Sequence, residues 1–131
     1  MLEAKPICLL IDDDEDDQLI FETTIHKYFS NYAFIGVYAF DDLEEMSVTV
    51  DINNLQRIVA IFLDLNMPKT NGIEILKWIK SHPVLNKTPV MIYSTSKNPT
   101  DKQLCQQLGA KGFVSKPSKI KDLVRELELV L

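Results

Sequence analysis

The sequence predicts an α/β fold in which a parallel sheet of five strands is covered by helices on both faces. Five short apolar segments alternate with five segments of helical periodicity, which is the order of parallel α/β proteins. The apolar segments are continuous rather than alternating, as expected for strands buried on both faces. The 131 residues are enough for one core, and we expect residues 1–131 to form a single domain.

Composition and charge are those of an ordinary globular domain, with 46% hydrophobic and 25% charged residues. The net charge of −5 argues against direct binding to nucleic acid, which needs a basic face. No apolar stretch reaches the roughly 18 residues of a membrane span, and the first residues lack a signal-peptide pattern. We therefore expect a cytoplasmic protein with no membrane partner and no second domain. Cys8 and Cys105 lack C-x-x-C spacing, and we expect both to be reduced and buried.

The first strand is expected at residues 7–11, an apolar run that leads directly into six acidic residues at 12–17. Asp16 or Asp17 suits the start of the next helix, because the helix dipole favours anions there. Four apolar residues of that helix recur at the spacing of one helical face: Phe21, Ile25, Tyr28 and Phe29.

A second strand is expected at residues 33–40, followed by a short helix through Met46 with Asp41 or Asp42 as its N-cap. Residues 47–57 mix polar and β-branched side chains, and we interpret them as a helix end and a loop.

The third strand is the apolar run at residues 59–64, which ends in Asp64. Pro68 marks a loop directly after it, and the helix that follows at residues 73–81 is stopped by Pro83.

The fourth strand, at residues 90–93, ends at Ser94. Asn98, Pro99 and Asp101 then provide an N-cap, a first-turn proline and a first-turn acid for a helix that Gly109 ends. The fifth strand, at residues 112–115, is followed at once by Lys116 and Pro117, and a final amphipathic helix runs from residue 120 to the end.

Polar residues follow four of these strands at the point where each strand ends. They are Asp12 and Asp13, then Asp64, Ser94 and Lys116. Each has an ordinary explanation alone, since aspartate and serine often begin turns and a single lysine usually lies at the surface. In a parallel sheet, however, all of these strand ends share one edge, which is where ligands bind in open α/β sheets.

These residue types together predict phosphoryl-transfer chemistry. Neighbouring carboxylates repel one another unless a cation neutralises them, and Mg²⁺ prefers carboxylate oxygens. A carboxylate can also act as a nucleophile, and Asp64 on the middle strand is the natural choice. Lys116 would neutralise charge on a phosphoryl group, and the hydroxyl of Ser94 would donate a hydrogen bond to one of its oxygens. The product would be an acyl phosphate on Asp64.

The chain thereby resembles the response-regulator receiver domains of bacterial two-component signalling, in particular the stand-alone receivers of chemotaxis and of phytochrome kinases. The resemblance covers nearly the whole chain. Its motifs are residues 10–13, residues 62–68 with Asn71-Gly72, Ser94, and residues 109–117. Ser94 follows Asp64 by 30 positions and Lys116 follows Ser94 by 22, both typical of the family.

The resemblance implies a flavodoxin-like, doubly wound (βα)5 fold with strand order 2-1-3-4-5. It implies that Asp64 is the phosphoacceptor, and that Mg²⁺ is bound by the side chains of Asp12, Asp13 and Asp64 and the backbone carbonyl of Asn66. It further implies a cis peptide bond before Pro117, which would aim Lys116 at the site.

Ser94 and Phe113 match the family's switch pair. Phosphorylation would turn Ser94 toward the phosphate and bring Phe113 inward, although phenylalanine here replaces the frequent tyrosine. Asn66 and Ser96 occupy the two positions that tune loss of the phosphate to water.

The implied partners are a sensor histidine kinase or a histidine phosphotransfer protein, and an unidentified downstream protein. The chain would be no enzyme beyond its own phosphoryl acceptance and dephosphorylation. Its signal would leave by protein contact through the fourth helix, fifth strand and fifth helix, and a homodimer is compatible with the sequence. The segment between Asp13 and Asp64 is several residues longer than in the shortest receivers, with the surplus at residues 47–57.

Other protein classes match less well. A haloacid-dehalogenase-type phosphatase needs D-x-D-x-[T/V] after the first strand, and an EF-hand needs glycine and glutamate where Asp17 and Thr23 stand. A flavin carrier needs a phosphate-binding loop, which six acidic residues would oppose. A receiver-like interaction module that is never phosphorylated stays open, and metal-dependent phosphorylation distinguishes it from a working receiver.

Overall fold

The computed structural model describes residues 4–95 and 98–131, and within them five parallel strands form one sheet in the order β2-β1-β3-β4-β5. The fold class and strand order are those expected from the sequence. The strands are β1 (Ile7–Ile11), β2 (Ala33–Val37), β3 (Ile58–Leu63), β4 (Val90–Ser94) and β5 (Gly112–Ser115).

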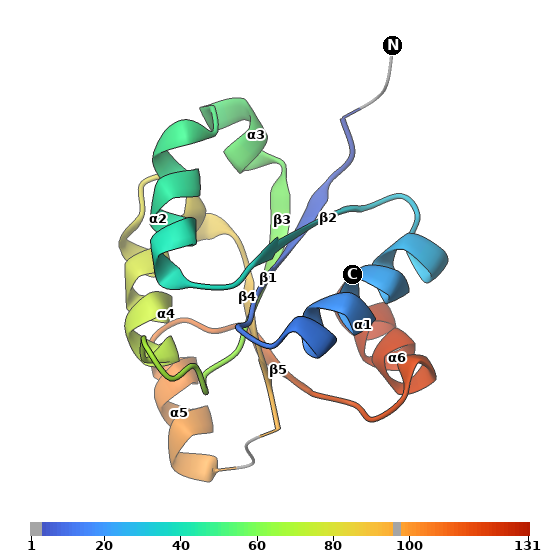
Figure 1. The fold of residues 1–131 in the computed structure, drawn as a ribbon. Helices are drawn as coiled ribbons and strands as arrows, with labels where there is room; N and C mark the ends of the chain where they lie inside the picture. Colours follow the sequence, from blue (N-terminus) through green and yellow to red (C-terminus); the bar gives the residue numbers. More distant parts are fainter. Residues whose placement is uncertain (1–3, 96–97) are drawn as a thin grey trace.

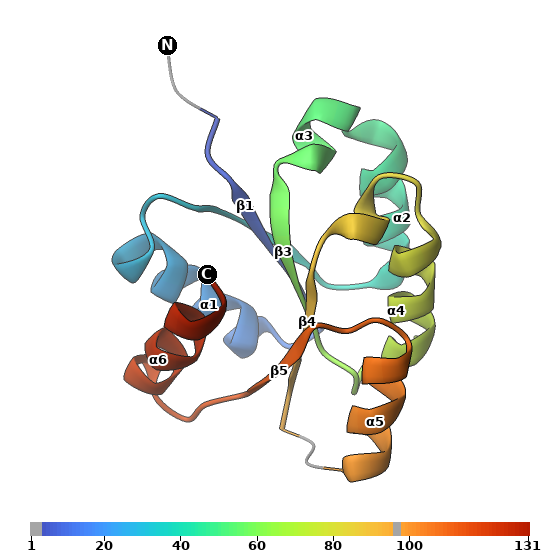
Figure 2. The same cartoon turned by 180° about the vertical axis from the view of Figure 1, so that it is seen from behind.

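Helices cover both faces of the sheet (Figures 1 and 2). One face carries α1 (Glu15–Tyr28) and α6 (Ile120–Val130). The other carries α2 (Phe40–Thr49), α4 (Gly72–Ser81) and α5 (Pro99–Gln107). Two short helical segments, α3 (Ile52–Gln56) and the 3-10 turn η1 (Leu85–Lys87), connect the larger elements. None of the helices in the described part of the chain has the length and apolar character that crossing a lipid bilayer requires.

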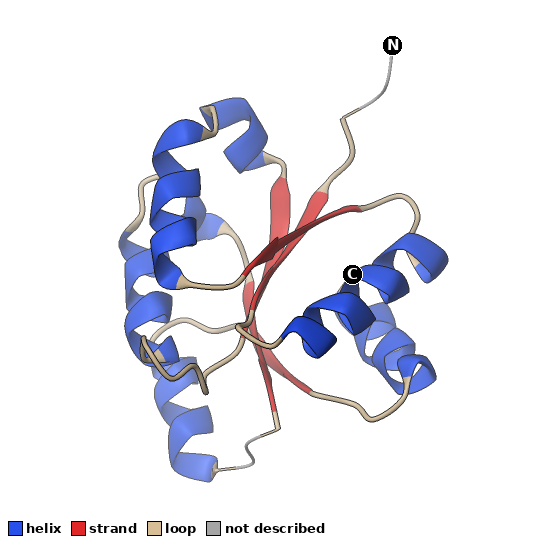
Figure 3. Cartoon of the chain, viewed as in Figure 1, coloured by secondary structure: helices blue, strands red, loops and turns tan. Residues whose placement is uncertain are grey.

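The strands, red in Figure 3, lie between helices on either side. Successive side chains of a strand point to opposite faces, so the sheet separates two hydrophobic layers. Leu10 and Phe62 pack with Phe21 of α1 and Leu123 of α6. The intervening strand residues pack against α4: Leu9, Ile11, Ile61 and Leu63 belong to the same cluster as Ile75, Leu76 and Ile79. Cys8 and Cys105 are buried and free, as predicted.

The register of the strands aligns their carboxyl ends. Ile11 is paired with both Val37 and Leu63. Backbone hydrogen bonding continues one residue beyond the strands, since the N–H of Asp64 donates to Ile11 O at 2.9 Å and that of Lys116 donates to Ser94 O at 3.1 Å. The backbone of the predicted site residues is therefore held in place at one edge of the sheet.

Asp16 and Asp17 lie in the first turn of α1, as predicted, although neither is the residue that caps the helix. Asp14 is the N-cap, and its Oδ1 accepts hydrogen bonds from the N–H groups of Asp16 at 2.8 Å and Asp17 at 3.1 Å. Phe21 and Ile25 are fully buried as predicted, whereas Tyr28, at the last residue of the helix, is 49% exposed.

The second strand ends at Val37 rather than residue 40, and Phe40 instead begins α2. Its ring packs edge-on against Trp78 of α4, with ring centroids 5.4 Å apart. Asp41 and Asp42 lie in the first turn of α2 and do not cap it, since the N-cap is Ala39. This helix continues beyond Met46 to Thr49.

Residues 47–57 contain a further helix that the sequence did not reveal. They hold the end of α2 and the single turn and a half of α3, whose N-cap Asp51 accepts a hydrogen bond from Asn54 N–H at 2.9 Å. Because α3 leads directly into β3, it lies at the amino end of that strand, away from the carboxyl edge of the sheet (Figure 1).

Candidate functional site

Three carboxylates meet where β1 and β3 end. Asp12 is fully buried and Asp64 is 3% exposed, whereas Asp13 lies at the surface. One carboxylate oxygen from each lies within 4.8 Å of the others. The backbone fixes the two buried side chains, because Asp14 N–H donates to Asp12 Oδ1 at 2.9 Å and Asn66 N–H donates to Asp64 Oδ1 at 3.0 Å.

Lys116 reaches this cluster from the end of β5. Its Nζ lies 2.8 Å from Asp12 Oδ2, 2.7 Å from Asp17 Oδ2 and 3.2 Å from Asp64 Oδ2. The Nζ atom also lies 5.6 Å from the ring centroid of Tyr93, which is buried beneath it. The lysine predicted from the sequence thus joins the predicted carboxylates in one ion-pair network.

The expected cis peptide bond before Pro117 is not found, and the bond between Lys116 and Pro117 is trans. That prediction was wrong. The trans form is the intrinsically favoured one by about 0.5–1 kcal/mol, and the trans backbone still brings Lys116 Nζ to 3.2 Å from Asp64. A cis bond is therefore not needed to direct this side chain into the site.

Asp17 is a member of the network that the sequence did not identify. It is the third residue of α1, and its side chain is 26% exposed. In a run of six acidic residues, nothing distinguishes Asp17 from Asp16 until the start of the helix is known. With Asp14 as the N-cap, the helix turns Asp17 toward Lys116 and leaves Asp16 exposed.

Burial and charge perturb the site's proton affinities. Burial raises the pKa of Asp12 to about 6, although the nearby ammonium of Lys116 and the hydrogen bond from the Asp14 N–H act in the opposite direction. Burial alone would lower the pKa of Lys116, but the carboxylates of Asp12 and Asp17 outweigh it and hold this pKa above its ordinary value. Lys116 is therefore fully charged at neutral pH.

The donor set fits a hard divalent cation. Within the described residues, Asp12 Oδ2 is a buried oxygen that accepts no hydrogen bond, even though the charge of Lys116 lies 2.8 Å away. A cation bound by Asp12, Asp13 and Asp64 would satisfy this oxygen and balance the surplus of negative charge. Three carboxylates with room for water are the ligands that Mg²⁺ prefers.

Asn66 and Ser94 lie beside the carboxylates. The Asn66 side chain donates a hydrogen bond to Ser94 Oγ at 3.3 Å, so it connects the end of β4 to the loop that follows Asp64. Ser94 is 6% exposed. A role of the Asn66 carbonyl in metal binding stays a prediction. Ser96, the other residue expected to tune dephosphorylation, lies outside the described residues.

Phe113 is half-buried on β5 and packs against the layer of the core that includes Ile92. Lys102 of α5 lies over its ring, with Nζ 5.3 Å from the ring centroid. A pocket of about 150 Å³ is lined by Ser94, Lys102 and Phe113, among others. The two predicted switch residues therefore border the same cavity.

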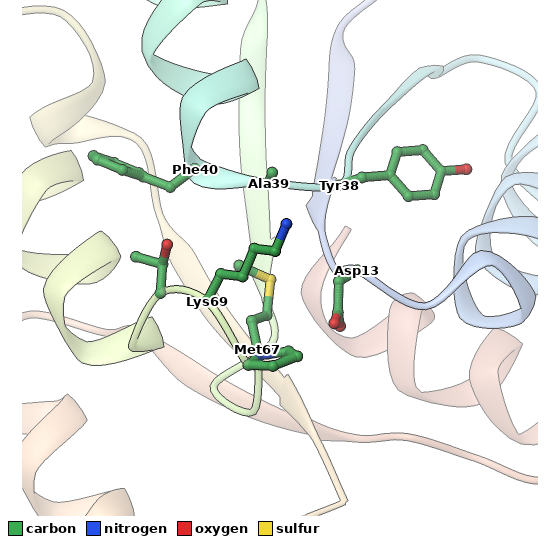
Figure 4. A pocket seen from close by; sticks show the side chains of 8 residues that line it. Asp13, Tyr38, Ala39, Phe40, Met67 and Lys69 are labelled. Atoms are coloured by element: carbon green, nitrogen blue, oxygen red, sulfur yellow. The ribbon is translucent and has the colours of Figure 1, made fainter.

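A second, mostly apolar pocket of about 190 Å³ adjoins the acidic cluster. Asp13, Tyr38, Phe40, Met67 and Lys69 line it. Figure 4 shows Lys69 extending from the loop after β3 toward the segment that joins β2 to α2, with Asp13 on the opposite side. This pocket gives the site an accessible apolar wall next to an exposed carboxylate.

Comparison with known proteins identifies the family to which the chain belongs. Residues 8–128 match the response regulator receiver domain. The chain belongs to this family. It is thus a receiver domain of a response regulator, a class of protein that works in two-component signalling.

Individual relatives agree with this placement. Response regulator Rcp1 of Synechocystis is 28% identical over 96% of this chain and 88% of its own length. Chemotaxis protein CheV1 of Helicobacter pylori is 31% identical over 63% of the chain, but the chain spans only 25% of that protein. The chain likewise spans about half the length of several other curated receivers that it matches.

Solved receiver structures share the fold over nearly the whole chain. The Mn²⁺-bound form of Rcp1 has a TM-score of 0.78 and 25% identity and covers 95% of this chain and 91% of its own. The phosphorylated cyanobacterial phytochrome response regulator RcpA has a TM-score of 0.81 and 25% identity and covers 97% of this chain and 91% of its own.

Proposed function

We propose that this receiver accepts a phosphoryl group on Asp64 and passes the signal on by protein contact. The observation that carries the proposal is the meeting of Asp12, Asp13 and Asp64 with Lys116 at the carboxyl edge of the sheet. A buried nucleophilic carboxylate, a set of cation ligands and a fixed ammonium group are the parts that phosphoryl transfer requires.

In the proposed reaction, a carboxylate oxygen of Asp64 attacks the phosphorus of a phosphohistidine. A P–O bond forms as the P–N bond breaks, and the electron pair of that bond returns to the imidazole of the donor. The product is an acyl phosphate on Asp64. Water later attacks the same phosphorus, which releases inorganic phosphate and restores the carboxylate. The chain is in this sense no enzyme, since it acts only on itself.

The residues around Asp64 have distinct parts in this proposal. Asp12, Asp13 and Asp64 would hold Mg²⁺, with the Asn66 backbone carbonyl as a further ligand, and Mg²⁺ supplies positive charge to the phosphoryl oxygens when bound. Lys116 binds a phosphoryl oxygen directly. The Mn²⁺-bound Rcp1 and phosphorylated RcpA structures, both 25% identical to this chain, support these assignments.

The proposed output face consists of α5, β5 and α6. Ser94 turns toward the phosphoryl oxygens and Phe113 moves into the cavity that the two residues border. This movement exchanges the cation–π contact with Lys102 for contacts in the core. It alters the surface that α5 and β5 present to a downstream protein.

The proposed donor is a sensor histidine kinase or a histidine phosphotransfer protein, in keeping with the family. The exposed Asp13 belongs to the acidic cluster and also lines the apolar pocket of Tyr38, Phe40 and Met67, so this pocket offers such a donor a surface next to the site. A donor that buries this apolar wall would also exclude water from the site during transfer.

Intact-protein mass spectrometry after incubation with acetyl phosphate tests the proposal. The wild-type chain is expected to gain one phosphoryl group, only when Mg²⁺ is present, and hydroxylamine is expected to remove it. Asp64→Asn removes the nucleophile and should give no adduct. Asp13→Ala should give none either, because it removes a cation ligand. An adduct retained in Asp64→Asn would mean that the nucleophile is another residue.

A receiver-like module that binds its partner without phosphorylation is the alternative. Such a module would gain no adduct from acetyl phosphate, phosphoramidate or a phosphorylated histidine kinase, with or without Mg²⁺. The presence of Asp12, Asp13, Asp64 and Lys116 in one network favours the working receiver, because an unphosphorylated module has no need for buried like charges.

A further inference from the structure

The ammonium group of Lys116 is shared by three carboxylates, and one of them is not explained by cation binding. An ammonium has three N–H bonds, and three carboxylate oxygens lie within 3.2 Å of Lys116 Nζ. Two of these come from Asp12 and Asp64 of the acidic cluster. The third and shortest contact, 2.7 Å, is to Asp17, which lies outside the set of candidate cation ligands.

A phosphoryl group on Asp64 would place new anionic oxygens beside this ammonium. Lys116 would then have to give up one of its present contacts, because its ammonium already donates hydrogen bonds to Asp17 and Asp64 and lies 2.8 Å from Asp12 Oδ2. Asp12 and Asp64 are held by backbone N–H donors at the ends of buried strands. Asp17 stands on α1 with a side chain that is 26% exposed, so water can replace the ammonium there.

We propose that Asp17 is a positioning residue that holds Lys116 in the unphosphorylated state and releases it when Asp64 is phosphorylated. This inference rests on the proposed function. Asp17 then opposes phosphorylation in two ways: it competes with the phosphoryl oxygens for the ammonium, and it reduces the positive charge that Lys116 offers to an incoming anion. Its removal should favour the phosphorylated state.

Asp17→Asn tests the proposal, with Asp16→Asn as the matched control. Asp16 is the preceding residue in the same first turn of α1, it is exposed, and its N–H also donates to Asp14 Oδ1. Both substitutions therefore remove one charge from the same helix end. At saturating Mg²⁺, Asp17→Asn is expected to react with acetyl phosphate about three to thirty times faster than wild type. Asp16→Asn should stay within about twofold.

Binding of beryllofluoride, a stable mimic of the phosphoryl group, gives an equilibrium measurement of the same effect by ¹⁹F NMR. Asp17→Asn should bind it more tightly by a similar factor. In a Lys116→Ala background, Asp17→Asn should give no gain, because the effect acts through the ammonium. A gain of equal size in that background would overturn the proposal, since Asp17 would then act by its charge alone.

Slower reaction or weaker beryllofluoride binding in Asp17→Asn would also overturn it, because Asp17 would then assist Lys116. Thermal unfolding verifies that each variant is folded. The two failures are distinguishable. No Asp64 adduct in the wild type contradicts the proposed function, whereas a wild-type adduct with equal rates for Asp17→Asn and Asp16→Asn contradicts only the role of Asp17.

Discussion

Replacement of Gly72 by alanine should destabilise the chain, although alanine is the better helix former. Gly72 is the first residue of α4 and lies against the loop that follows Asp64. A β-carbon there would lie 2.5 Å from Leu65 Cα and 2.9 Å from the Asp64 carbonyl oxygen. Both are backbone atoms, so no side-chain rotation relieves the contact. Either α4 or the loop must move.

Whether Gly72→Ala stabilises or destabilises the chain depends on the sizes of two opposing contributions. Alanine gains at most about 1 kcal/mol over glycine in a helix interior, and less at a first helical position. Overpacking against a fixed neighbour costs about 1–3 kcal/mol, and backbone neighbours favour the upper part of this range. The net loss of unfolding free energy is about 1–2 kcal/mol. With an unfolding entropy of about 2.1 cal/mol/K per residue, the melting temperature should fall by about 4–7 °C.

Gly112→Ala is the matched control, because a β-carbon at Gly112 would meet nothing closer than Met91 Cγ at 3.9 Å. It should melt within about 2 °C of wild type. Circular dichroism measures both transitions. Since the backbone that would move belongs to Asp64 and to the loop after it, Gly72→Ala should also weaken Mg²⁺ binding, measured by calorimetry. A Gly72→Ala chain that melts no lower than wild type and binds Mg²⁺ equally well would refute the argument.

Two further predictions concern the charges of the site. Lys116→Ala should lose most of the change in amide chemical shifts that beryllofluoride causes in the wild type. It should bind Mg²⁺ at least as tightly as the wild type, because the cation no longer competes with an ammonium for Asp12 and Asp64. An unchanged chemical-shift response to beryllofluoride would show that Lys116 is dispensable. The stabilisation by Mg²⁺ should depend on pH. The pKa of Asp12, about 6 in the metal-free fold, exceeds its unfolded value. Between about pH 4 and 6 the carboxyl group of Asp12 is therefore protonated in the folded chain but ionised in the unfolded chain. Protonation of Asp12 raises the free energy of unfolding of the metal-free chain as the pH falls through this range, by up to about 3 kcal/mol. Mg²⁺ needs the ionised carboxylate, so its effect on the melting temperature should be full at pH 7.5 and mostly lost at pH 5. Equal effects at both values would contradict the assigned role of Asp12.

The sequence predicted the strands and the site edge because both depend on simple regularities. A buried parallel strand requires a continuous apolar run, and each run in this chain ends where a polar residue begins. Parallel strands place those ends on one edge, which is why Asp12, Asp64 and Lys116 were expected together before any distance was known. The helix start at Asn98 was predicted correctly. Asparagine is a favoured N-cap residue, and proline is favoured at the first helical position that follows it.

The errors arose where local sequence leaves several equivalent choices. Among six adjacent acids, any of several can cap a helix, and only the packing of α1 selects Asp14. The segment at residues 38–40 continues the apolar run of β2, yet Phe40 begins α2, where it packs against Trp78, a residue distant in sequence. The peptide bond before Pro117 depends on a preference of about 0.5–1 kcal/mol, which the surrounding structure easily decides.

The position of Lys116 suggests how the proposed phosphorylation of Asp64 would reach the surface. Its side chain belongs to the acidic network, while its backbone N–H is bonded to Ser94 O and continues the pairing of β4 with β5. Phe113 lies three residues earlier, on β5, and borders the same cavity as Ser94. In the proposed function, a change in what the ammonium binds would therefore act on two strands at once, at the point where both carry a predicted switch residue. Because Asp17 on α1 accepts a hydrogen bond from that ammonium, the proposed exchange of one carboxylate for a phosphoryl oxygen would link α1, β4 and β5 in a single event.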